Sequence, residues 1–246
     1  DIFAIQSDVA GKISQQLRGS FSAGLPQQPL TAAVAIEGYH LYLKGRYFLN
    51  KLTPDSLQKA LQFFRQTLDI DPTYARGYAG ISMAYAMLGN FDYMPNREAL
   101  PKARAAAQTA LDLNDRMSEA HVAMGLVLFY YDWKWAEAER EFRRALELNP
   151  NFSEGQTCYS WLLSAMARWD EAVAAAEQAV HADPLSPFAN TNLGWVLGNA
   201  GRIEESIDQF HKTLEIAPDY TFARACMSVP LVVAGRYQEA AEIMEK

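Results

Sequence analysis

The segments Ala145-Leu-Glu-Leu-Asn-Pro150, Ala179-Val-His-Ala-Asp-Pro184 and Thr213-Leu-Glu-Ile-Ala-Pro218 decide the fold of this 246-residue chain. Their prolines are spaced 34 residues apart, and a fourth segment of the same kind, Thr67-Leu-Asp-Ile-Asp-Pro72, lies upstream. Proline ends a helix because it has no amide hydrogen to donate to the preceding turn and disfavours a helical residue before it. The sequence therefore predicts a helical repeat with a fixed period.

A 34-residue period with a helix-turn-helix pattern is typical of the tetratricopeptide repeat (TPR). We therefore predict an all-α, right-handed superhelical solenoid of antiparallel helix pairs, with about five full repeats and a truncated sixth. The repeats are expected near residues 36–74, 75–117, 118–152, 153–186, 187–220 and 221–246. They form a solenoid domain over residues 32–246. One amphipathic helix over residues 1–19 and an uncharged linker over 20–31 precede it.

Small residues in the first helix of a repeat should let the second helix approach closely, as with Gly125 and Gly194. Two repeats are irregular. The second has nine extra residues, which we expect to form a loop over 90–98, either on a binding face or folded back onto its own hairpin. The sixth stops within its second helix, so we expect an exposed apolar edge that could support self-association.

The composition limits the class of partner. With 22 basic and 29 acidic residues the net charge is −7, which argues against a nucleic-acid surface. No apolar run is long enough to span a membrane. Cys158 and Cys226 are separated by twice the repeat period, too far apart for a disulfide, and the compartment stays open.

Motifs for chemistry are absent from the sequence. The four histidines fall in separate repeats without metal-ligand spacing, and no phosphate-binding or nucleophile motif occurs. The charged cluster around Glu139 and Arg143 is best explained as a solvated helix face supported by an i,i+4 pair. We therefore expect no enzyme, no catalytic residue, no cofactor and no metal.

Several stretches resemble one TPR subfamily. They are Asp1–Ile13, Gly38–Tyr47, Tyr131–Pro150 and Leu193–Leu197. These are similar to arrays in bacterial multidomain signalling proteins, where they follow winged-helix transcription activators, class III nucleotide cyclases or serine/threonine kinases. The resemblance implies a bacterial regulator, often with a membrane span between its parts. It covers nearly the whole chain and contains no effector residues.

The first helix of each repeat should line the concave groove of the solenoid, with positions 2, 5, 6, 9, 12 and 13 of the repeat facing it. Trp161 and Trp195 both occupy position 9, so we expect them on one wall of the groove. Phe188 and Phe222, at position 2, are expected mainly in the core. The other candidate binding residues are Asn192, Asn199, Thr157, Thr191, Phe129, Tyr130, Met83, Arg46 and Tyr42.

Aromatic side chains supply contact area and amides can bond a peptide backbone, so the sequence favours a protein–protein interaction module. Its partner would be a peptide or a protein domain held in the groove. Two alternatives stay open: a small-ligand sensor, which would need a closed pocket with converging polar groups, and a dimerisation arm.

Overall fold

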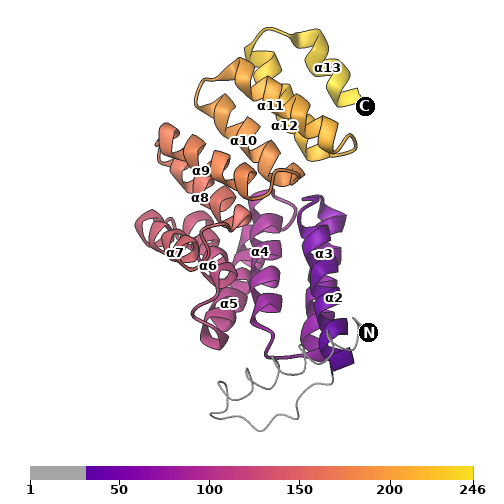
Figure 1. The fold of residues 1–246 in the computed structure, drawn as a ribbon, viewed down its shortest axis with the longest axis vertical. Helices are drawn as coiled ribbons and strands as arrows, with labels where there is room; N and C mark the ends of the chain where they lie inside the picture. The colour runs from indigo at the N-terminus through magenta and orange to yellow at the C-terminus, as the bar shows by residue number, and fades with distance from the viewer. Residues whose placement is uncertain (1–31, 246) are drawn as a thin grey trace, which may run out of the picture. The chain divides into compact units, whose positions relative to one another are not determined.

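The computed structural model describes residues 32–245, and these form helices alone, without a strand. The expected helix over 1–19 lies outside the described residues. The chain divides into two compact units, residues 1–33 and 34–246. Within the second unit the helices pair as hairpins that follow one another in chain order (Figure 1). The first three hairpins are α2 (Ala32–Leu49) with α3 (Pro54–Ile70), α4 (Ala75–Asn90) with α5 (Asn96–Leu113), and α6 (Ser118–Tyr130) with α7 (Trp135–Leu148).

The last three hairpins keep the same form. They are α8 (Ser153–Ala165) with α9 (Trp169–Ala182), α10 (Pro187–Asn199) with α11 (Ile203–Ile216), and α12 (Thr221–Val233) with α13 (Tyr237–Glu245). α13 is the shortest, with nine residues. The predicted all-α fold of five full repeats and a shortened sixth is confirmed.

Each hairpin closes where a small residue meets a large one. Phe142 of α7 and Phe210 of α11 are fully buried. They lie against Gly125 of α6 and Gly194 of α10, where an added Cβ would come within 2.8 and 3.0 Å of the rings. Only glycine allows so close an approach of the two helices. This contact fixes the hairpin geometry on which the groove depends.

The turn inside each hairpin contains one residue in the left-handed backbone region. Gly201 and Gly235 adopt φ of 80° and 76° there, but the equivalent residue of α8–α9 is Ala167, with φ of 56°. The other hairpins place Leu52, Asp92 and Trp133 in the same region. Glycine is favoured at such a position because it lacks the Cβ that clashes. The hairpin turn therefore keeps its left-handed residue even where that residue has a side chain that disfavours the conformation.

Thr53, followed by Pro54, caps the start of α3. The Thr53 hydroxyl accepts a hydrogen bond from the Ser56 amide (3.3 Å), and the Ser56 hydroxyl accepts one from the Thr53 amide (3.0 Å). This capping box satisfies two amides that the helix itself leaves free.

The extra residues of the second repeat correct the expected loop over 90–98. α4 extends to Asn90 and α5 begins at Asn96, so only residues 91–95 lie between them. Most of the insertion therefore lengthens the two helices, which have 16 and 18 residues. Phe91 and Met94 of the short loop pack on the core.

Contacts also join repeats that are far apart in sequence. The Tyr220 hydroxyl, at the start of α12, donates a hydrogen bond to the Asn50 carbonyl at the end of α2 (2.8 Å). Phe222 of α12 makes an edge contact with Phe91, with ring centroids 5.6 Å apart. A simple solenoid has contacts only between neighbouring repeats. Here the first and second repeats both reach the sixth.

Candidate binding groove

One apolar pocket of about 470 Å³ opens between the first helices of repeats three to six. α6, α8, α10 and α12 supply most of its wall, and the end of α4 completes it. The lining residues are mainly aromatic or amide-bearing: Asn90, Phe91, Phe129, Tyr130, Trp161, Ser164, Ala165, Trp169, Phe188, Thr191, Asn192, Trp195, Asn199, Phe222 and Cys226. We call this the aromatic pocket. A volume of this size is typical of ligand sites.

The two tryptophans at position 9 both line this pocket but differ in freedom. Trp161 is half-buried, and its indole N–H donates to the Asn192 side-chain oxygen (2.6 Å). Asn192 in turn donates to the Ser160 hydroxyl (2.9 Å). Trp195 has 41% of its surface exposed. The Trp161 and Asn192 side chains therefore fix one another's position, whereas the Trp195 ring stays partly exposed.

Further predicted residues surround the same space. The Phe129 and Tyr130 rings lie against one another at a tilt, with centroids 4.4 Å apart, and the Tyr130 and Trp161 centroids are 6.4 Å apart. Burial raises the pKa of Tyr130, and the nearby Cys158 thiol raises it further, so the phenol stays neutral. Asn199 is exposed at the end of α10. The structure thus brings Trp161, Trp195, Asn192, Asn199, Thr191, Phe129 and Tyr130 to one pocket.

Two buried hydroxyls in the pocket wall lack hydrogen-bond partners. The side-chain oxygens of Ser164 and Thr191 are enclosed and unpaired among the described residues. Polar atoms in such a position usually find a partner, because an unmade hydrogen bond costs about 1–3 kcal/mol. These two hydroxyls are buried polar groups of the pocket wall that no hydrogen bond within the described residues satisfies.

A second pocket of about 600 Å³ continues the groove toward the C-terminus. It shares Trp195, Asn199 and Cys226 with the aromatic pocket and extends along α12 to Val229 and Val233. Val229 and Val233 are each 65% exposed. Among the described residues that line the two pockets, none carries a charge. The two pockets therefore share an uncharged wall on α10 and α12.

Four predicted groove residues lie outside the aromatic pocket. Thr157 is fully buried, and Tyr42 is buried against Phe64 and Tyr74. These two are core residues, because their rings or methyl groups fill space between helices. Arg46 pairs with Glu154, and Met83 faces a small cavity at the end of α2.

Sequence reasoning missed Phe91, Trp169, Asn90 and Ser164 as pocket residues. Phe91 belongs to the insertion and Trp169 to the second helix of repeat four, so the groove positions of first helices do not include them. Ser164 occupies position 12 and could have been found by the same repeat register. Phe188 and Phe222, expected mainly in the core, are largely enclosed but also line the pocket.

Comparison with known proteins supports the repeat fold. Residues 160–221 match the tetratricopeptide repeat family. A thermophilic TPR protein of Thermus thermophilus superposes with a TM-score of 0.60 at 16% identity, over 79% of this chain and 99% of the other. The chain folds as a TPR solenoid. Solenoids of this kind serve binding of other proteins through extended surfaces.

Two curated relatives contain a similar segment. "Transcriptional regulator HilA" of Salmonella typhimurium is 26% identical over 129 residues, which are 52% of this chain and 23% of HilA. "Putative adenylate cyclase 3" of Rhizobium meliloti is 28% identical over 132 residues, 52% of this chain and 22% of the cyclase. The TPR segment thus spans less than a quarter of either relative.

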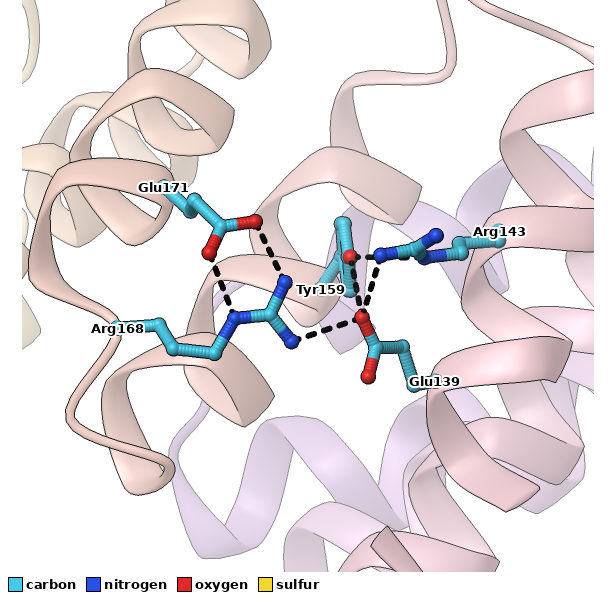
Figure 2. Close-up of polar contacts among 5 residues, drawn as sticks. All are labelled: Glu139, Arg143, Tyr159, Arg168 and Glu171. Carbon is cyan, nitrogen blue, oxygen red and sulfur yellow. Dashed lines mark hydrogen bonds and ion pairs between the residues drawn. The ribbon is translucent and has the colours of Figure 1, made fainter. Parts of the chain in front are cut away.

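A polar cluster joins repeats three and four of the TPR array (Figure 2). One Glu139 carboxylate oxygen accepts hydrogen bonds from Arg143 and Arg168 (both 2.8 Å) and from the Tyr159 hydroxyl (3.0 Å). Burial raises the pKa of Glu139, but these donors outweigh it and hold the pKa below its ordinary value. Arg168 also pairs with Glu171. Glu139 is therefore an ionised structural acceptor, ill suited to proton transfer.

Further properties of the described part of the TPR array concern metal ligands, free cysteines and membrane spans. Over residues 32–245 no group of three or more His, Cys, Asp or Glu is placed to hold a metal ion. Cys158 and Cys226 are free, and burial raises the pKa of both thiols. No described helix has the length and apolar character needed to cross a membrane.

Proposed function

We propose that this TPR array is an interaction module that binds a peptide or a partner domain through the groove face of α8, α10 and α12. The continuous uncharged surface formed by the aromatic pocket and its C-terminal extension carries the proposal. Exposed apolar surface of this extent on a folded protein usually marks a binding site.

The residues that line the two pockets indicate which side chains a partner would insert. With no charged lining residue, the groove favours a segment that inserts apolar or aromatic side chains. Trp195 is the natural anchor, because exposed tryptophans contribute a large share of binding energy at interfaces. The amides of Asn90 and Asn199 lie in the wall and can bond the backbone of an extended peptide.

The parent protein is proposed to be a larger bacterial regulator. HilA is named as a transcriptional regulator, and the other relative as a cyclase. Since these share only the repeat segment with this chain, the array would be the regulatory part that receives a partner. The catalytic or DNA-binding part would then lie in another domain.

A selected peptide tests the binding site. Peptides from a random displayed library are selected against the chain, and the tightest is titrated by fluorescence anisotropy. Trp195→Ala should weaken its binding by about 2 kcal/mol or more. Trp133→Ala is the matched control, since Trp133 is 74% exposed and lies outside both pockets. Equal affinity for the wild type and Trp195→Ala would refute the proposal.

Small-ligand sensing remains a second candidate, favoured by one observation. The unpaired hydroxyls of Ser164 and Thr191 lie in the wall of an aromatic pocket and could bond a compact polar group. Thermal-shift screening of neutral aromatic compounds tests this candidate. A ligand whose stabilisation is lost in Thr191→Val would support it, and one unaffected by that change would oppose it.

A further inference from the structure

The turn between α2 and α3 fills the N-terminal part of the groove. Leu49 and Leu52 are 3% and 4% exposed, although they lie at the end of a helix and in a turn. They face Met83 and Leu126, which occupy position 9 of repeats two and three. A cavity of only about 20 Å³ remains between these groups. Part of the groove is therefore occupied by the chain itself.

The backbone of this turn is held in an unfavourable conformation. Leu52 adopts φ of 54°, in the left-handed region that leucine disfavours. Burial of the Leu49 and Leu52 side chains in the groove compensates for this strain. Every hairpin turn of the array has one left-handed residue, so this conformation belongs to the repeat, and the buried leucine side chains are what fill the groove here.

Polar contacts fasten the same turn to distant repeats. Arg46 of α2 pairs with Glu154 at the start of α8, and both side chains are largely enclosed. The Asn50 carbonyl accepts the hydrogen bond from Tyr220 of α12. Burial raises the pKa of the Tyr220 hydroxyl, so it remains a donor at neutral pH.

The end of α4 makes a parallel connection. Phe91 lines the aromatic pocket and makes an edge contact with Phe222 of α12, which also lines it. Phe222 also contacts Tyr220, with ring centroids 6.3 Å apart. The hydrogen bond and the ring contacts thus form one continuous link across the groove.

We propose that this link, made by Asn50 and Phe91 with Tyr220 and Phe222, is an autoinhibitory clasp that competes with partner binding in the groove. The clasp rests on the proposed binding function and describes its regulation. A partner longer than the C-terminal pockets must displace the Leu49–Leu52 turn and part the clasp. Binding is then coupled to a movement of α2.

The coupling has a defined thermodynamic form. A protein that binds only in its open state shows an apparent affinity reduced by the fraction that is open. Any change that weakens the clasp without touching the partner must therefore strengthen binding. If the turn and the partner compete for the groove, weakening the clasp increases the binding affinity. If the contact is purely structural, no such increase is expected.

The Tyr220→Phe variant removes one hydroxyl and keeps the ring on Phe222. Loss of a single neutral hydrogen bond should raise the affinity for the selected peptide by about five-fold. Tyr237→Phe is the matched control, because Tyr237 also belongs to repeat six but is 68% exposed. It should bind as the wild type does. Unchanged or weaker binding by Tyr220→Phe would overturn the clasp.

A distance measurement separates this proposal from the binding function. Spin labels are attached through a genetically encoded ketone amino acid at Lys51 and Asp219, both exposed positions beside the clasp. The peptide should lengthen the distance between the labels. If Trp195→Ala fails to weaken the peptide, the binding function is refuted. If it does weaken the peptide but the label distance stays constant, the clasp alone is refuted.

Discussion

The contact of Gly125 with Phe142 allows a sharp test of how the hairpins pack. In Gly125→Ala the new Cβ would lie 2.8 Å from the Phe142 ring. Carbon atoms in favourable contact are about 3.5–4.0 Å apart, so the overlap is about 0.7 Å or more. Phe142 is fully buried and has no room to retreat.

The magnitude follows from two opposing effects. Replacing a glycine by alanine inside a helix stabilises it by about 1 kcal/mol. Overpacking a closed core costs about 1–3 kcal/mol. We therefore expect Gly125→Ala to leave the free energy of unfolding unchanged or lower it by up to about 2 kcal/mol.

A matched substitution isolates the steric effect. Gly38 lies inside α2, and its added Cβ would meet Ile70 at 3.5 Å, an ordinary contact. Gly38→Ala should therefore stabilise the protein by about 1 kcal/mol. Urea unfolding followed by far-ultraviolet circular dichroism measures both variants. If the two substitutions raise the unfolding midpoint by the same amount, the close approach at Phe142 does not limit the hairpin.

Two further predictions concern the turns and the pH dependence. Residues 167 and 201 both have a left-handed backbone, which favours glycine. In urea unfolding, Ala167→Gly should therefore raise the free energy of unfolding by about 1 kcal/mol, and Gly201→Ala should lower it by about as much. If both substitutions change the free energy of unfolding in the same direction, this prediction is wrong. The hydrogen bond with Glu141 (2.6 Å) raises the pKa of His121 above 6.5, although burial lowers it. The stability from this pair is therefore complete below about pH 6.5 and lost as the pH rises through the folded pKa. Glu141→Gln should flatten the fall in urea midpoint between about pH 6 and 8, and an unchanged slope would refute the role of the pair.

Several groove residues could be predicted because the repeat acts as a coordinate system. Trp161 and Trp195 line one pocket because 34 residues return a helix to the same place in the next hairpin. Tyr42 and Thr157 fit the same register but are buried. A register fixes which side of a helix a residue occupies. It does not show which neighbour covers that side.

The sequence by itself determined the helical repeat, the hairpin order and the small-to-large contacts, because these depend on residues close together along the chain. Only the tertiary structure decided how far the groove remains open. The Asn50–Tyr220 and Phe91–Phe222 contacts join residues more than a hundred positions apart. Such contacts arise from small rotations added over successive repeats, and no local pattern encodes that sum. The proline spacing thus specified the wall of the groove, and long-range packing specified what fills it.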